Sequence, residues 1–230
     1  MIRYGLYMLL VFLLSACANE SIGDSATAPG EISGEKPILK SEVKNEAMLK
    51  PEPYVDFITN PDNGLTVTKE IGNFLFSVIY KPLDFVAMIN LEKDSVKYMN
   101  VNKERSEIAG MQYFTLKLEA RDFNDELLKF NLNSDRQYED RVNYFAFRMQ
   151  QDIQLIEGKD TLNCELFHFE RNYGAAPYAS FILGFENTGD TNRIYDKTIS
   201  LNEKVFGTGK VNITISKESI ANIPQLTFEN

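Results

Sequence analysis

The fold is decided by residues 145–168, which read FAFRMQQDIQLIEGKDTLNCELFH. Apolar and polar side chains alternate on both sides of Gly158-Lys159, as they do in strands with one buried face. A two-residue turn there, with a positive φ at Gly158, would place Leu155 opposite Leu162. In that register the apolar faces coincide, whereas a slip of one residue would put them on opposite sides of the sheet. The stretch therefore predicts an antiparallel β-hairpin.

The same alternation predicts how far the two strands of the hairpin extend. On the first strand, one face would collect Phe145, Phe147, Met149, Gln151, Ile153 and Leu155. On the second strand, the shared face would hold Leu162, Cys164, Leu166 and His168. Ile153 would then lie opposite Cys164, which is expected to be a small buried hydrophobic residue. His168 is expected to be an ordinary residue of the sheet face.

Four further segments show the two-residue period of strands, at 74–80, 113–121, 181–185 and 211–215. Two short helices are expected. One follows Pro82, and the other begins at Ser134, which forms a capping-box pattern with Gln137. Because strands at short spacing outnumber helices, the sequence predicts a mainly β protein. We expect one antiparallel β-sandwich-like domain, or an α+β domain, with one or two short helices.

The N-terminal residues 1–16 have the three parts of a secretory signal. Arg3 supplies a positive start, and the uncharged run from Leu6 to Leu14 follows it. That run is shorter than the roughly twenty apolar residues that a membrane-spanning helix needs. Two small residues, Ser15 and Ala16, then precede Cys17. Residues 1–16 are therefore expected to direct export and to be removed.

Leu14-Ser15-Ala16-Cys17 resembles the lipobox of bacterial lipoproteins, in which a leucine precedes two small residues and a cysteine. The resemblance implies cleavage after Ala16 and attachment of a diacylglyceryl group, with its fatty-acyl chains, to the sulfur of Cys17. The next residue is Ala18 and not Asp, which by the same resemblance favours the outer over the inner membrane of a Gram-negative cell. The rest of the chain resembles uncharacterised lipoproteins of Gram-negative bacteria, such as those of Bacteroidota.

Composition divides the remaining chain into two parts. Residues 17–53 are poor in aromatic side chains and contain four prolines, so they are expected to form a lipidated N-terminus and a flexible tether. Residues 54–230 hold nearly all the Phe and Tyr and have the size of one globular domain. The net charge of −9 argues against nucleic acid as a partner, because binding to phosphates depends on Lys and Arg.

The sequence offers no set of catalytic or metal-binding residues. The single histidine, His168, would lie roughly 13 Å along the strand from Cys164, too far for a nucleophile and its base. One histidine and one free cysteine cannot supply a zinc site. We therefore expect no catalytic residue, no metal and no cofactor. If Cys17 is lipidated, Cys164 has no partner for an internal disulfide.

One segment is a candidate binding loop. Residues 171–178 join two strand patterns and contain Arg171, Tyr173 and Tyr178, of the residue types enriched at binding hot spots. The leading hypothesis is a non-catalytic lipoprotein of the cell envelope whose domain binds another envelope protein or has a structural role. Two alternatives stay open: a hydrolase of glycan or peptidoglycan that uses paired carboxylates, and a glycan-binding lipoprotein.

Overall fold

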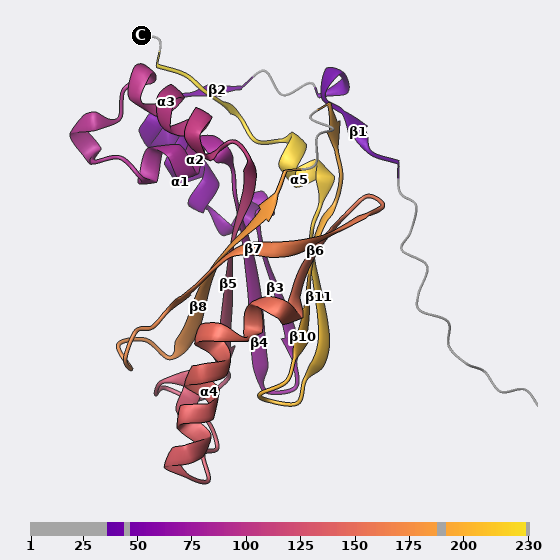
Figure 1. Cartoon of the computed structure of the whole chain (residues 1–230). Helices are drawn as coiled ribbons and strands as arrows, with labels where there is room; N and C mark the ends of the chain where they lie inside the picture. The colour runs from indigo at the N-terminus through magenta and orange to yellow at the C-terminus, as the bar shows by residue number, and fades with distance from the viewer. Residues whose placement is uncertain (1–35, 44–46, 188–191, 229–230) are drawn as a thin grey trace, which may run out of the picture. The chain divides into compact units, whose positions relative to one another are not determined.

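The computed structural model describes residues 36–43, 47–187 and 192–228. Their main element is an eight-stranded antiparallel sheet, with strand order β11-β10-β6-β7-β8-β5-β4-β3 (Figure 1). The strands are β3 (Thr66–Ile71), β4 (Phe74–Lys81), β5 (Met111–Ala120), β6 (Ile153–Glu157), β7 (Asp160–Glu170), β8 (Tyr178–Glu186), β10 (Lys197–Glu203) and β11 (Gly209–Ile215). The prediction of a mainly β, antiparallel domain is confirmed, and each of the four segments with strand periodicity forms a strand.

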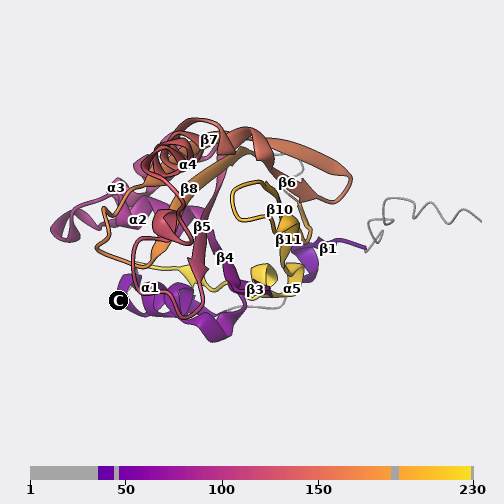
Figure 2. The same cartoon turned by 90° about the horizontal axis from the view of Figure 1, so that it is seen from below.

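The sheet curls until its two edge strands approach each other, so that it is nearly closed into a barrel. β3 and β11 are in contact, and the ammonium group of Lys69 on β3 donates a hydrogen bond to the carbonyl of Asn212 on β11 at 3.3 Å. Viewed end on, the strands follow one another round a ring (Figure 2). One curled sheet thus supplies both layers of the expected sandwich-like packing.

The interior of the barrel is filled with aliphatic and aromatic side chains. Phe181 on β8 is fully buried, and its ring centroid lies 5.1 Å from that of Phe169, 5.2 Å from Phe145 and 5.6 Å from Phe167. The other fully buried or nearly buried interior residues include Phe76, Val78, Phe114, Leu116, Ile153, Leu155, Leu183, Phe185, Ile199, Leu201, Val211, Ile213 and Ile215. Apart from a bulge in β7, inward and outward side chains alternate along the strands, which is why the two-residue period was visible in the sequence.

The hairpin at the centre of the prediction forms with the expected turn. Leu155 lies opposite Leu162, and Gly158 has a φ of 61°. A Cβ at Gly158 would also lie 2.9 Å from a ring carbon of Tyr195, so both the backbone and the space favour glycine. The ladder between the two strands begins at Gln154 and Asn163.

The predicted strand from Phe145 to Asp152 is wrong. Helix α4 (Asp135–Phe147) and the 3-10 helix η5 (Met149–Asp152) occupy that segment. Ser134 caps α4 by accepting a hydrogen bond from the backbone N–H of Gln137, so the capping pattern was the stronger signal. Phe145 at the end of α4 and Met149 at the start of η5 are both buried, so both belong to the core although the strand does not form.

The predicted face of the second strand is correct only as far as Cys164. A register shift between Cys164 and Leu166 marks a β-bulge in β7. The extra residue reverses the alternation, so Leu166 and His168 are exposed on the outer face while Phe167 and Phe169 pack against the core. No hydrophobic pattern in the sequence distinguishes this bulge, because apolar residues occupy both 166 and 167.

More helices form than the one or two expected. The described ranges contain five α-helices: α1 (Pro51–Thr59), α2 (Leu83–Ile89), α3 (Tyr98–Ile108), α4 and α5 (Lys217–Ala221). The two predicted helices correspond to α2 and α4. Short 3-10 helices are η1 (Lys40–Glu42), η2 (Pro61–Asn63), η3 (Lys93–Ser95), η4 (Leu127–Lys129) and η5. No helix in these ranges combines the length and apolar character required to cross a bilayer.

Part of the range expected to be a tether is folded. β1 (Ile38–Leu39) pairs with β9 (Arg193–Ile194), and β2 (Met48–Leu49) pairs in parallel with β12 (Gln225–Leu226). Helix α1 then begins at Pro51, before the expected domain start at residue 54. These two-residue strands are held by main-chain hydrogen bonds, which leave little trace in composition.

Candidate functional site

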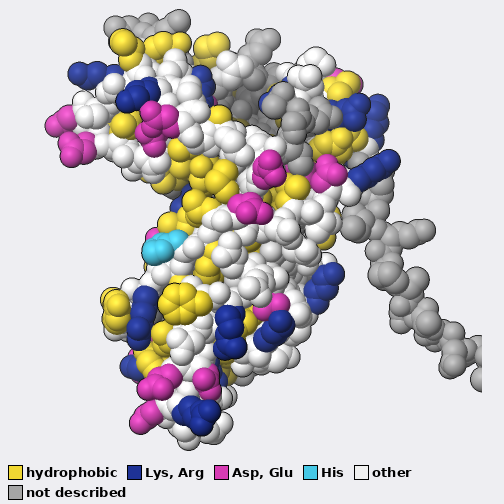
Figure 3. Space-filling view, in the orientation of Figure 1, with side chains coloured by type: hydrophobic (Ala, Val, Ile, Leu, Met, Phe, Trp, Pro, Cys, Tyr) yellow, Lys and Arg dark blue, Asp and Glu magenta, His cyan; other side chains and the backbone are white. Residues whose placement is uncertain are grey.

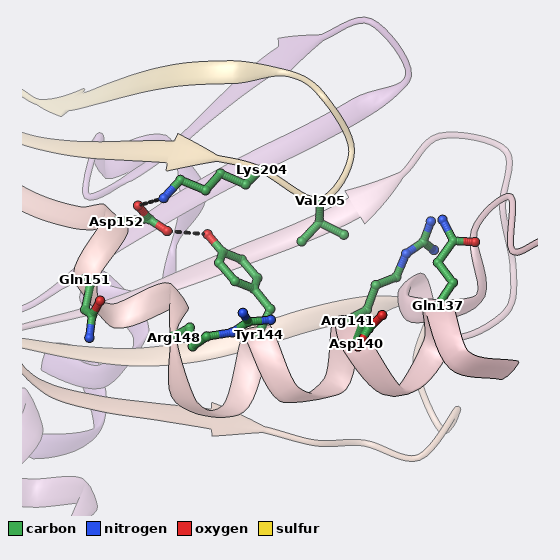
Figure 4. Close-up of a pocket in the computed structure, with 9 residues that line it drawn as sticks. All are labelled: Gln137, Asp140, Arg141, Tyr144, Arg148, Gln151, Asp152, Lys204 and Val205. Carbon is green, nitrogen blue, oxygen red and sulfur yellow. Dashed lines mark hydrogen bonds and ion pairs between the residues drawn. The ribbon is translucent and has the colours of Figure 1, made fainter. Parts of the chain in front are cut away.

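A cleft of about 440 Å³ lies between α4 and the loop that follows β10 (Figure 4). Helix α4 provides one wall through side chains three or four residues apart, which project from one side of a helix. The 3-10 helix η5 and the loop provide the other wall. The lining residues are Gln137, Asp140, Arg141, Tyr144, Arg148, Gln151, Asp152, Lys204 and Val205.

Asp152 links the two walls of the cleft. Its Oδ2 accepts a hydrogen bond from the Tyr144 hydroxyl at 2.8 Å, and its Oδ1 accepts one from the ammonium of Lys204. Burial, followed by the hydrogen bond to Asp152, raises the pKa of Tyr144 well above its ordinary value, so the hydroxyl stays protonated and donates at neutral pH. Both oxygens of Asp152 are thus occupied by partners of its own chain.

Hydrogen bonds of Arg141 and Glu203 fix the two walls of the cleft. The guanidinium of the buried Arg141 donates hydrogen bonds to the carbonyls of Leu128 at 2.8 Å and Phe130 at 2.6 Å. The buried carboxylate of Glu203 accepts hydrogen bonds from the backbone N–H groups of residues 205, 206 and 208. These bonds fix the helix on one side and the loop on the other, so the cleft is preformed.

The side chains free to meet a ligand lie at the rim. Arg148 is exposed, its guanidinium lies 5.8 Å from the ring of Tyr144, and it forms no ion pair with any described residue. Phe147, beside it at the end of α4, has a relative exposure of 75%. Figure 3 shows hydrophobic, basic and acidic side chains next to one another over the α4 end of the domain. Beside the cleft, α4 therefore ends in an exposed aromatic ring, Phe147, and in a cation, Arg148, that has no ion-pair partner among the described residues.

The predicted binding loop packs against a different side of α4. Arg171 donates a hydrogen bond to the hydroxyl of Tyr138 at 2.9 Å, and that hydroxyl donates to the buried carboxylate of Glu126. Tyr138 follows the cleft residue Gln137 by one position, which is about 100° around the helix. The loop and the cleft are therefore separate features on two sides of α4.

The structure brings together two of the three predicted loop residues. The guanidinium of Arg171 lies 4.6 Å from the ring of Tyr173, whereas Tyr178 begins β8 and is covered by the ammonium of Lys117 at 4.8 Å. Tyr173 is 77% exposed and has a φ of 52°, which is unusual for a residue other than glycine. Backbone strain of this kind often accompanies binding sites. Arg171 fixes the loop, and Tyr173 is its exposed side chain.

The residues of the α4 cleft were missed from the sequence. A stripe of polar and charged side chains with helical spacing runs along 137–148, but the segment from Phe145 onward was interpreted as a strand. Lys204 and Val205 lie more than fifty positions further along the chain, and only the fold brings them to α4. The helical stripe was the one signal in the sequence that could have revealed half of the cleft.

Neither cysteine is among the described residues that line the α4 cleft. Cys17, the expected site of lipid attachment, lies outside the described residues. Cys164 is a free, buried thiol, and burial raises its pKa to about 12, so it is a weak nucleophile. Cys164 and His168 lie on opposite faces of β7 because of the bulge. The described ranges contain no group of three potential metal ligands.

The geometry of the site is thus a preformed cleft on a nearly closed barrel, with Arg148 in its lining and the exposed Phe147 next to it in the chain. The lining residues of the cleft include no serine, cysteine or histidine. Comparison with known proteins adds no relative: no family model, no curated protein and no solved structure matches the chain.

Proposed function

We propose that this protein is a lipoprotein of the bacterial envelope, anchored through Cys17, whose barrel is a non-catalytic module that binds another envelope protein. Residues N-terminal to the described domain would tether it to the membrane, the outer rather than the inner one. The partner would dock on the rim of the α4 cleft. The lipobox pattern supports the anchor, and the exposed Phe147-Arg148 pair supports the docking site.

The proposed docking site rests on the exposure of Phe147 and Arg148. Phenylalanine and arginine are both enriched in the cores of protein interfaces, and arginine is also among the residues that dominate binding energy. Phe147 is 75% exposed although it follows Phe145, which is completely buried. The two side chains lie at the end of a helix whose cleft wall is fixed by buried hydrogen bonds. A rigid base reduces the entropy lost when the rim side chains are ordered by a partner.

The rim also indicates the chemistry of the partner. Arg148 has no carboxylate partner in the described part of the chain, so we propose that the docking protein supplies an Asp or Glu to it. The same protein would cover the ring of Phe147 with an apolar side chain. Phe147 lies outside the cleft lining, so one small ligand in the cleft would leave this ring uncovered.

Site-specific photocrosslinking tests this proposal in the full-length protein within the membranes of its host. A photoreactive phenylalanine analogue at position 147 is expected to give one discrete adduct with an envelope protein. Arg148→Glu should reduce that adduct at least tenfold, because reversal of a hot-spot charge typically weakens binding by 2 kcal/mol or more, about thirtyfold.

Two matched controls are used. The photoreactive analogue at position 99 replaces the one at position 147, and Lys103→Glu replaces Arg148→Glu. These two residues of α3 are also exposed, Met99 to 81%, and combine an apolar side chain with a cation. Lys103→Glu should leave the adduct at position 147 unchanged. An adduct at 147 that is equally insensitive to Arg148→Glu, or no adduct at all, would contradict the proposed docking site.

A further inference from the structure

A second polar site lies at the opposite end of the barrel from the α4 cleft. Lys197 is the first residue of β10 and Glu203, which holds the cleft loop, is the last. Four polar residues point into the barrel at the Lys197 end, each two positions from a buried apolar residue on the same strand face. They are Tyr80 on β4, Gln112 on β5, Glu157 on β6 and Lys197 on β10. The apolar interior thus ends in a polar layer.

Hydrogen bonds join three members of this layer across the barrel. Lys197 lies opposite Glu157 in the ladder, and its ammonium donates to the Glu157 carboxylate and to the side-chain oxygen of Gln112. The amide nitrogen of Gln112 donates to the second oxygen of Glu157 at 2.7 Å. The side chains of Lys197 and Glu157 are each only 8% exposed. The layer is therefore a built structure with fixed positions.

A pocket of about 230 Å³ opens directly onto this layer. Lys197, Glu157, Gln112 and Tyr80 line it, together with Lys40 from η1 and Lys81 at the end of β4. Within the described ranges, neither Lys40 nor Lys81 forms an ion pair with a carboxylate. Among the residues that the structure describes, Glu157 is the single acidic residue of the pocket lining. The pocket is rich in cations although the whole protein has a net charge of −9.

The pKa values of Lys197 and Lys81 are both lowered in this pocket. Burial lowers the pKa of Lys197, and the charge of Lys40 lowers it further, while Glu157 opposes both effects. Burial likewise lowers the pKa of Lys81, with Lys117 acting in the same direction and Glu170 opposing it. The carboxylates in the described part of the chain thus offset the burial of these two ammonium groups only in part. A bound anion would stabilise them.

We infer that this pocket binds a small anion, through a carboxylate or a phosphate group. An ammonium has three donor hydrogens and Lys197 uses two of them on its neighbours, so one remains for the ligand. The Tyr80 hydroxyl adds a donor on the floor, and Lys40 and Lys81 supply charge at the rim. The volume is below the 300–1,000 Å³ of pockets for drug-sized molecules, which restricts the ligand to a small molecule or a terminal anionic group.

Equilibrium dialysis of the purified full-length protein tests the inference, with radiolabelled inorganic phosphate and radiolabelled succinate as separate probes. Sodium chloride is added so that every sample has the same ionic strength, because a difference in ionic strength would by itself change the attraction between the anion and surface charges. At least one probe is expected to bind with one-to-one stoichiometry. Lys40→Met and Lys81→Met should each weaken binding about tenfold, as expected for loss of one charge-assisted contact.

Lys103→Met is the matched control, because it removes the same charge from an exposed position on α3, outside the pocket. Its affinity should equal that of the unmodified protein, and circular dichroism should show all three variants folded. Binding of phosphate alone or succinate alone would identify which anionic group the pocket prefers. Binding of neither probe, or equal weakening by Lys103→Met, would overturn the inference.

Discussion

Glu157→Ala is expected to lower the free energy of unfolding by about 3–5 kcal/mol, because it leaves the Lys197 ammonium buried without its carboxylate. The substitution also removes the closer of the two acceptors of the Gln112 amide nitrogen and leaves only the Glu186 carbonyl at 3.4 Å, so the loss of this buried hydrogen bond adds to the effect. Urea denaturation followed by circular dichroism would measure the change. A decrease below about 1 kcal/mol would show that water reaches the polar layer and solvates the lysine.

Replacing the three hydrogen-bonded members of the layer distinguishes the loss of a partner from the loss of packing. The triple variant Glu157→Leu, Lys197→Met, Gln112→Leu removes the charges and the amide together. Buried ion pairs replaced by apolar residues of similar volume are often neutral or stabilising. The free energy of unfolding of the triple variant is therefore expected to be no more than about 1 kcal/mol below that of the unmodified protein.

The Glu157→Ala variant should also respond to pH in a defined direction. The folded-state pKa of Lys197 is already below its ordinary value, and loss of the carboxylate lowers it further. Between that pKa and the ordinary value of about 10.4, the unfolded chain binds more protons than the folded one. Stability then rises with pH, so the deficit of the variant should shrink as the solution is made alkaline.

Phe181→Ala is expected to lower the free energy of unfolding by about 3–5 kcal/mol, the usual range for removal of a buried phenylalanine. The Phe181 ring is fully buried and contacts three other rings, from α4 and β7. The resulting cavity cannot collapse easily, since strands on both sides fix its walls. The loss of edge-to-face and stacked ring contacts adds to the transfer term.

Phe147→Ala provides the matched control for Phe181→Ala. It makes the same chemical change at a ring that is 75% exposed, and it should change stability by less than about 0.5 kcal/mol. The same urea titration measures both variants. Equal effects of the two substitutions would mean that Phe147 is packed in solution, which would also remove the basis for docking at the α4 rim.

The sequence predicted the strands well because burial inside a barrel imposes a two-residue period. Phe76, Val78, Leu116 and Leu183 all point inward as expected. The prediction failed between Phe145 and Asp152, because two consecutive helices, α4 and η5, bury Phe145 and Met149 just as a strand would. The signal for α4 lay at its start, where Ser134 caps the helix.

Two other features of the fold had no local signal. The bulge near Cys164 exchanges Leu166 for Phe167 on the inner face, and both residues are apolar, so hydrophobicity could not reveal the change. β1 pairs with β9 and β2 pairs with β12, in both cases through main-chain hydrogen bonds to a distant segment. Such long-range pairings are decided by the assembled fold and not by the composition of the segment.

The candidate sites were less predictable than the strands. Arg171 and Tyr173 could be selected by residue type, and the structure places them together. Lys197 and Glu157, in contrast, are forty positions apart, and Gln112 reaches them only because the sheet curls. The α4 cleft likewise needs Lys204 from a distant loop. Contacts across a barrel become visible only when the strand order is known.

Mass spectrometry of the N-terminal peptide, from protein extracted from host membranes, tests the proposed anchor most directly. We expect the mature chain to begin at Cys17 and to carry a diacylglyceryl thioether, and we expect Cys17→Ser to release the protein from the membrane fraction. A mature chain that begins elsewhere, or an unmodified Cys17 in protein that still sediments with membranes, would contradict the proposal that this barrel is a lipid-anchored envelope protein.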